Sequence, residues 1–166
     1  MSCSVRPVTL SDIPFLWEML FYAARMSEDG AATAEAAKHD PHLKIYVEDW
    51  GRRGDWGVIA YELDNARPLG AAWLRLLTAD KSHCGYYDDV TPELAIAVLP
   101  EVIGQGVGSA LLAALIETVR PQAPAIVLTV RNNNPAIHLY ERFDFVVIDA
   151  VVNRVGTQSS QMLLKL

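Results

Sequence analysis

The chain has few cysteines, no long apolar run and no excess of basic residues, and each shortage excludes a class of protein. Its 166 residues include two cysteines, too few and too isolated for a disulfide framework or a zinc site. No apolar stretch reaches the length that crosses a bilayer, so no membrane span is expected. The formal net charge is −6 and the basic residues form no stripe, which argues against nucleic acid as a partner.

Metal ligands and a leader sequence are also missing. His39 and His42 are three residues apart, but no cysteine lies near them, so no metal is expected. The start of the chain lacks the apolar core of a signal peptide, which favours the cytoplasm. With 51% hydrophobic residues, a chain of this length is typical of one globular unit, so residues 1–166 are expected to form a single domain.

The most informative segment places three glycines at alternate positions between a strand and a helix. Residues 93–98 are an apolar run of strand length, and Gly104, Gly106 and Gly108 open a segment with apolar residues at the helical period. Glycines let backbone N–H groups approach a ligand closely, and a helix N-terminus adds partial positive charge. The pattern predicts a cradle for a phosphate or pyrophosphate.

Two common phosphate-binding motifs do not fit this segment. A P-loop needs Gly-Lys-Ser/Thr, and no lysine lies between Lys81 and Lys165. A Rossmann fingerprint starting at Gly104 needs a glycine at position 109, which is Ser109, and it follows the first strand of a domain. A glycine-rich turn that binds nothing and a nucleotide-binding protein of another fold stay open as alternatives.

Residues 133–145 carry a second pattern, which predicts a short helix. Asn134 is a good N-cap and Pro135 a good first helical residue. Ala136 and Tyr140 are four residues apart and share one helical face. A tyrosine found alone here would be read as a half-buried core aromatic. Its place downstream of the glycine segment makes Tyr140 a candidate functional residue.

Together the two segments resemble motifs of the GCN5-related N-acetyltransferases, the GNAT superfamily. The first is similar to the acyl-coenzyme A loop of that family, Gln/Arg-x-x-Gly-x-Gly/Ala, with Ile103 in the usual Gln/Arg position. The second is similar to Asn-x-x-Ala-x-x-x-Tyr-x-x-x-Gly-Phe, with Asp144 replacing the glycine. Aspartate tolerates the left-handed conformation better than most residues, so the turn can survive. At Ile103, one polar side chain expected near the pyrophosphate is missing.

The resemblance implies acetyl-CoA or a related acyl-CoA as the donor. Its pantetheine would pair with the backbone of Ile96, Ala97 and Val98 like an added strand, and an N–H near Val98 would face the thioester carbonyl. Asn133 would hydrogen-bond the cofactor from the neighbouring element. The pyrophosphate would contact the segment formed by Gly104, Gln105, Gly106, Val107, Gly108 and Ser109.

The reaction implied is direct attack of an amine on the thioester. A lysine-like amine has a pKa of about 10.4, so freeing its lone pair at pH 7 costs about 4 to 5 kcal/mol and a base helps. Glu93 is the candidate base; the alternative is a solvent-facing glutamate at a strand start. Asp88 and Asp89 are lesser candidates. Tyr140 would face the sulfur and donate a hydrogen bond as charge develops there.

The pattern of apolar residues predicts an α+β fold in the order β-α-α-β-β-β-α-β-α-β-β. This order matches the family over nearly the whole chain, which implies a single N-acetyltransferase domain with a mixed, mostly antiparallel central sheet flanked by helices. The strands are predicted at 5–8, 56–63, 69–77, 93–98, 125–130, 145–154 and 158–165, and the helices at 11–25, 31–38, 106–119 and 135–143, with a further helical piece up to Trp50.

The expected acceptor is a small-molecule amine or a peptide amine. The chain is acidic and has neither a basic patch for nucleic acid nor a basic amphipathic helix for a membrane. A non-catalytic acyl-CoA-binding or regulatory domain is the alternative function, and a homodimer is left open. The resemblance places the acceptor wall in residues 20–56 and 78–90, whose aromatic residues line a pocket or belong to the core: Phe21, Tyr22, Trp50, Trp56, Tyr86 and Tyr87.

Overall fold

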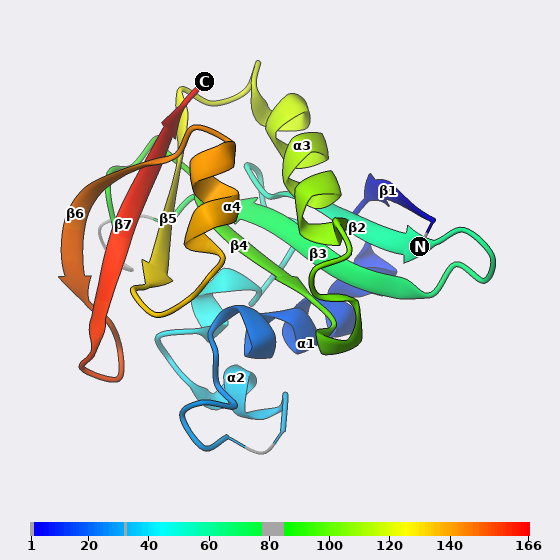
Figure 1. Cartoon of the computed structure of the whole chain (residues 1–166), viewed down its shortest axis with the longest axis horizontal. Coiled ribbons are helices and arrows are strands. Elements are labelled where there is room, and N and C mark those ends of the chain that lie inside the picture. The colour runs from blue at the N-terminus through cyan, green and yellow to red at the C-terminus, as the bar shows by residue number, and fades with distance from the viewer. Residues whose placement is uncertain (1, 32, 78–84) are drawn as a thin grey trace.

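The computed structural model describes residues 2–31, 33–77 and 85–166, and a seven-stranded sheet forms its centre (Figure 1). The strand order is β1-β2-β3-β4-β5-β7-β6, and every neighbouring pair is antiparallel except β4 with β5. The predicted α+β class and order of elements are confirmed. The strands are β1 (Cys3–Pro7), β2 (Trp56–Glu62), β3 (Pro68–Arg75), β4 (Glu93–Val98), β5 (Ala125–Arg131), β6 (Val146–Val152) and β7 (Gln158–Lys165).

Helices cover both faces of the sheet (Figure 1). On one face lie α1 (Ile13–Ala23) and α2 (Ala36–His39), and on the other α3 (Val107–Val119) and α4 (Ile137–Arg142). Along β3, Trp73 packs in the α1 core and Leu74 in the α3 core, because successive side chains of a strand point to opposite faces. The described chain contains no helix that is both long enough and apolar enough to cross a membrane.

The predicted helices between α1 and β2 are shorter than expected. Instead of a helix over 31–38, the described part of this segment contains only the single turn of α2, which ends because Asp40 takes an extended conformation before a proline. The further piece predicted up to Trp50 is a 3-10 turn at Lys44–Tyr46, which ends where Val47 leaves the helical conformation. The left-handed Asp49 (φ 59°) follows before β2. These residues therefore form a loop-rich layer against α1.

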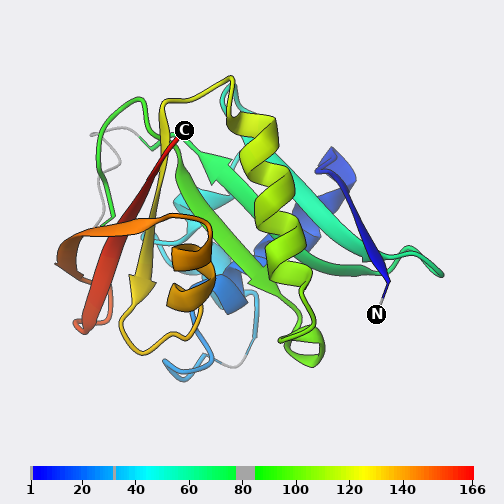
Figure 2. The ribbon, with the colours of Figure 1, turned by 45° about the horizontal axis from the view of Figure 1, so that its top comes forward.

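The sheet opens in its middle, between β4 and β5. These two strands are paired at one register position, Glu93 with Val127, and they diverge beyond it (Figure 1, Figure 2). β5 continues into a full ladder with β7 instead. The later part of β4 therefore has a strand on one side only, and the site is built around this opening.

Candidate active site

The opening between β4 and β5 is a cleft with a volume of about 1080 Å³. Its walls come from the end of α1, the 3-10 segment before β2, the two diverging strands, the loop before α3, α4 and the β6–β7 turn. Most of the residues predicted for the site line this one cleft: Glu93, Ile96, Ala97, Val98, Gly104, Gly106, Gly108, Ser109 and Tyr140.

The β4 edge presents unpaired backbone groups to the cleft. The N–H of Leu99 donates to the carbonyl of Leu69 (2.8 Å), which sets the alternation of the β3–β4 ladder. Residues between such bonded pairs point their N–H and C=O away from the partner strand. Ile96 and Val98 hold those positions, and no described strand pairs with them on the cleft side. An extended amide chain can pair with such an edge.

The glycine segment leaves the start of α3 uncovered. Gly104 and Gly106 have positive φ angles of 82° and 84°, and a Cβ at either would meet no atom within 4 Å. Glycine is therefore favoured at both positions by the left-handed backbone conformation and not by a lack of space for a side chain. A Cβ at Gly108 would lie 3.3 Å from Leu139 of α4. The exposed N–H groups and the N-terminus of α3 form a site suited to an anion.

Two residues of this segment do not line the cleft. Gln105 is exposed, and its Nε2 donates to the carbonyl of Glu101 (3.3 Å). Val107 is 1% exposed and packs in the core under α3, so only its backbone is available to a ligand. Ile103, at the position where a polar residue is usual, lines the cleft and is 67% exposed. The anion site is thus made mainly of backbone N–H groups.

Tyr140 reaches the cleft from α4. Its ring meets Phe145 edge to face, with 5.9 Å between the centroids, and the residue is 7% exposed. Burial raises the pKa of Tyr140, because a phenolate is poorly solvated there. The hydroxyl therefore stays protonated at neutral pH and can donate a hydrogen bond.

The start of α4 differs from the prediction. The helix begins at Ile137 rather than at position 135, but Asn134 still accepts a hydrogen bond, from the N–H of Ala136 (2.9 Å). Asn134 lines the cleft, whereas Asn133 does not. The binding role of Asn133 stays a prediction. After α4, Asp144 adopts the expected left-handed conformation (φ 71°).

Glu93 is buried on the α1 face of the sheet. Only 4% of it is exposed, so its interpretation as a solvent-facing glutamate is wrong. The hydroxyl of Tyr46 donates to its Oε1 (2.5 Å), and both residues line the cleft. The structure therefore holds a carboxylate in a fixed orientation at the point where β4 and β5 separate; its role as base stays a prediction.

No sequence pattern singled out Tyr46 or the contacts that hold it. Trp73 Nε1 donates to the carbonyl of Tyr46 (3.0 Å), and Arg75 donates to the neighbouring carbonyl of Ile45 (3.1 Å). Arg75 also forms a two-pronged ion pair with Asp55 (2.8 and 2.9 Å), and both side chains are almost fully buried. A lone arginine in an apolar strand is the signal that could have pointed to a buried partner.

Ion pairs join the two sides of the cleft at the end of α1. Asp29 accepts hydrogen bonds from Arg131 on β5 and from Arg154 in the β6–β7 turn, each at 2.7 Å. Both arginines also donate to the carbonyl of Ala24 (3.2 and 3.3 Å). The hydrogen bond from Arg131 lowers the pKa of Asp29. Sequence spacing gave no signal for this cluster, because Asp29 lies 102 residues from Arg131 and 125 residues from Arg154.

Of the six aromatic residues considered for the acceptor wall, Tyr22 alone lines the cleft. Phe21 is buried in the α1 core, and the Trp50 ring lies over the Arg75 guanidinium at 5.4 Å. Tyr46 and Tyr140 are the other described aromatic residues that line the cleft.

The two aspartates considered as lesser base candidates act within their own loop. Asp88 accepts the N–H of Thr91 (2.7 Å), and Asp89 accepts the hydroxyl of Tyr86 (2.6 Å). Neither lines the cleft, and residues 78–84 of the predicted acceptor wall lie outside the described residues. In the described ranges, no group of three or more His, Cys, Asp and Glu is placed to hold a metal ion.

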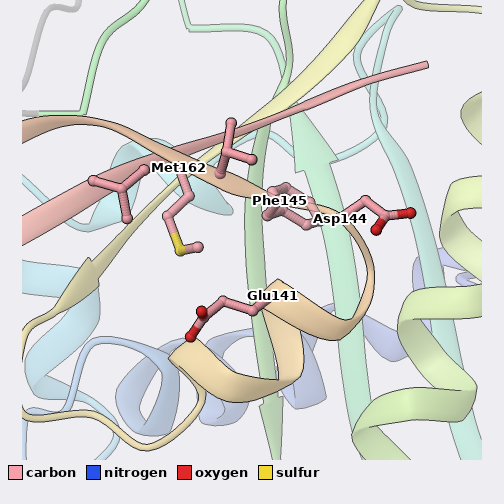
Figure 3. A pocket seen from close by; sticks show the side chains of 6 residues that line it. Glu141, Asp144, Phe145 and Met162 are labelled. Carbon is pink, nitrogen blue, oxygen red and sulfur yellow. The ribbon is translucent and has the colours of Figure 1, made fainter.

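A smaller hollow of about 430 Å³ lies beside α4 and β6 (Figure 3). Phe145 and Met162 form part of its apolar lining, and Glu141 and Asp144 stand at its edge. It shares no lining residue with the cleft, and none of its lining residues is a glycine. The chemistry suited to an acyl donor is therefore concentrated in the cleft.

The family model described as Acetyltransferase (GNAT) family matches residues 19–145. This match covers more than half of the chain and includes the β4 edge, the glycine segment and Tyr140. The protein belongs to the GNAT acetyltransferases. No curated protein matches the chain in sequence.

Solved structures share the fold over the whole chain. A ribosomal-protein-alanine N-acetyltransferase from Brucella melitensis has a TM-score of 0.71 at 20% identity, covering 98% of this chain and 99% of its own. The yncA protein of Salmonella typhimurium, solved with its cofactor acetyl-CoA, has a TM-score of 0.70 at 20% identity, with 100% and 95% covered. A chimera of the spermidine N-acetyltransferase SpeG from Vibrio cholerae has a TM-score of 0.66 at 18% identity, covering 99% of this chain and 96% of its own. These similarities confirm the predicted fold.

Proposed function

We propose that the protein transfers an acetyl group from acetyl-CoA to a small-molecule amine or a peptide amine. The observation that carries this proposal is the convergence of four features in one cleft: an unpaired β4 edge, an open glycine segment, a protonated tyrosine and a buried carboxylate. Two similar structures support it, since yncA was solved with acetyl-CoA and SpeG is a spermidine N-acetyltransferase.

Two open surfaces of the cleft support acetyl-CoA as the donor. Ile96 and Val98 would pair with the amides of the pantetheine. The N–H groups from Gly104 to Ser109 would hold the pyrophosphate, except that of Gln105, which donates to the carbonyl of Val102 (3.3 Å). Because no side chain covers Gly104 or Gly106, phosphate oxygens can approach the backbone closely. When bound, acetyl-CoA supplies the acetyl group as a thioester.

Glu93 and Tyr140 would divide the proton transfers. Glu93 would take a proton from the acceptor ammonium, directly or through one water, so that the nitrogen lone pair can form the new C–N bond. Tyr140 would donate a hydrogen bond to the sulfur as the C–S bond breaks. A free tyrosine is already a weaker acid than a thiol, by about 2 kcal/mol, and burial widens this gap. Hydrogen bonding, with protonation of sulfur completed late, is therefore the proposed role.

Binding of acetyl-CoA can be tested at the glycine segment with a matched control. Gly106→Glu places a negative side chain where the pyrophosphate would lie, and Gly156→Glu introduces the same residue at nearly the same φ angle (84° and 85°), also in open space. Calorimetry should show that Gly106→Glu abolishes binding, whereas Gly156→Glu binds like the wild type. Equal affinity in both variants would contradict the pyrophosphate assignment.

Turnover distinguishes the enzyme from a non-catalytic acyl-CoA-binding domain. Release of free thiol from acetyl-CoA should be measured against amines, amino acids, aminoglycosides and peptide N-termini. At least one amine should accelerate release well above the rate of hydrolysis. Tight binding of acetyl-CoA without release in the presence of any of them would favour the binding-domain alternative.

A further inference from the structure

The Gly85–Tyr86 segment lies behind Glu93, outside the lining of the cleft, and a buried glutamine holds it there. Nε2 of Gln161 donates to the carbonyl of Gly85 (2.9 Å) and lies 3.4 Å from that of Tyr86. Gln161 is 5% exposed and stands opposite Thr129 in the β5–β7 ladder. A side-chain amide that is buried to this degree and bonded to a loop carbonyl fixes that loop to the sheet.

Gly85 fits into a notch between the two diverging strands. A Cβ at this position would lie 2.4 Å from Oγ1 of Thr129 on β5 and 2.7 Å from Oε1 of Glu93 on β4. Both distances are shorter than real Cβ contacts, so only glycine allows the segment to come this close. The Thr129 hydroxyl is buried and has no hydrogen-bond partner among the described residues.

Glu93 is thus enclosed from two directions by parts of the chain distant in sequence. Tyr46 donates to its carboxylate from the segment before β2, and Gly85 packs against the same oxygen from the segment before β4. Glu93 and Tyr46 also line the cleft, so the carboxylate lies between the Gly85–Tyr86 segment and the cleft. The position of this segment therefore affects how solvent and ligand atoms reach Glu93.

We propose that Gln161 is a positioning residue for the acceptor reaction, which it serves by holding the Gly85–Tyr86 segment against Glu93 and Thr129. This inference rests on the proposed function in taking Glu93 as the group that receives the acceptor's proton. Gln161 itself does not line the cleft, so it acts through the segment. Loss of its hydrogen bond frees the segment, opens Glu93 to bulk water and loosens the approach of the acceptor.

The first experiment measures the enclosure of Glu93 without needing turnover. Carbodiimide and an amine nucleophile label accessible carboxylates, and mass spectrometry reads the labelling of each peptide. Gln161→Met removes the amide at similar volume, and Gln158→Met makes the same change at an exposed position of the same strand. We expect several-fold faster labelling of Glu93 in Gln161→Met and wild-type labelling in Gln158→Met. Unchanged labelling of Glu93 in Gln161→Met overturns the proposal.

The second experiment tests whether the effect on rate passes through Glu93. Gln161→Met should lower kcat/KM for the amine acceptor about 5- to 50-fold, as expected for a misplaced catalytic group, while KM for acetyl-CoA stays within twofold. Combined with Glu93→Gln, it should add less than a further twofold, because the group it positions is already gone. Fully additive losses, or an equal rise in KM for acetyl-CoA, overturn the positioning role.

A third variant pair guards against a general packing defect. Gly85→Ala should increase labelling of Glu93 and lower the acceptor rate, and adding Thr129→Ala should recover part of both by removing the closer clash. If the double variant unfolds at the wild-type midpoint but recovers neither property, Gly85 does not fit between Thr129 and Glu93 as described. A wild-type protein that acetylates no amine refutes the proposed function, while the labelling result still decides whether Gln161 encloses Glu93.

Discussion

Tyr140 and Glu93 reach the cleft from opposite faces of the sheet. Tyr140 belongs to the core under α3 and α4, whereas Glu93 points to the α1 face, where Tyr46 meets it. This arrangement is possible because β4 and β5 diverge and leave no strand between the two side chains. It suits a reaction in which the acceptor arrives on one side of a thioester and the thiol leaves on the other.

Replacement of Tyr140 by phenylalanine should remove a hydrogen bond that forms only as the thiolate leaves. Tyr140→Phe should lower kcat by about ten- to a thousandfold, the range of general-acid effects, with little change in the affinity for acetyl-CoA measured by calorimetry. Tyr61→Phe, on β2 outside the cleft, serves as the control. Wild-type turnover in Tyr140→Phe would return Tyr140 to a purely structural role.

The contribution of Glu93 should depend on pH. Glu93→Gln keeps the size of the side chain but cannot accept a proton, so its cost should be largest at low pH, where free amine is scarcest. The cost should shrink as the pH rises toward the pKa of the amine. Profiles of kcat/KM between pH 6 and about 10 measure this, with Glu117→Gln on the exposed side of α3 as control. A loss that is uniform across pH would indicate positioning or stability instead.

At the scale of elements, the entry into α1 is fixed by one carboxylate. Asp12 accepts hydrogen bonds from both terminal guanidinium nitrogens of Arg6 (2.8 Å each) and from the N–H of Thr9 (2.7 Å). The hydrogen bonds from Arg6 lower the pKa of Asp12 from 3.8 to about 2. The contact joins β1 to the start of the helix whose other end lines the cleft.

The stability that Asp12 contributes should therefore be lost in acid. Because its folded pKa lies below the unfolded value, the contribution is complete above about pH 4 and disappears as the pH falls through about 2. Asp12→Asn should lower the free energy of unfolding by about 1 to 2 kcal/mol at pH 7, less than the full shift because Arg6 is partly exposed. Urea unfolding at pH 7 and at pH 2.5 should show the difference shrinking; exposed Asp64→Asn should show none.

At the scale of the whole molecule, charge should affect which acceptors arrive fastest. The net charge is −6. Arg131 and Arg154, which lie near the end of α1, are paired with the acidic residues Glu28 and Asp29. Cationic amines should therefore be attracted to the protein. Their kcat/KM should fall several-fold as salt rises from about 0.05 to 0.5 M, because ions screen this attraction. The rate for an acceptor without net charge should hardly change. Faster turnover of hydroxyl or anionic acceptors than of every amine would contradict the charge argument.

Local patterns determined the elements and the cofactor side of the cleft. The strand at 93–98 and the helix that follows the glycines were predicted within one residue, because an apolar period and glycine signals are properties of adjacent residues. The glycine segment and Tyr140 belong to two short motifs, and the resemblance of these motifs to the family indicated their roles and that of the β4 edge. Local signals failed for α2 and the segment up to Trp50, where short helices without caps depend on packing.

The acceptor side was decided only by the tertiary structure. Whether Glu93 was exposed could not be read from its place at a strand start, because Tyr46 and Gly85 that enclose it come from other parts of the chain. The same holds for Asp29 with Arg131 and Arg154. Sequence patterns report which face a residue occupies along its own element. Burial, ion pairs and the orientation of a carboxylate depend on which distant elements the sheet brings together.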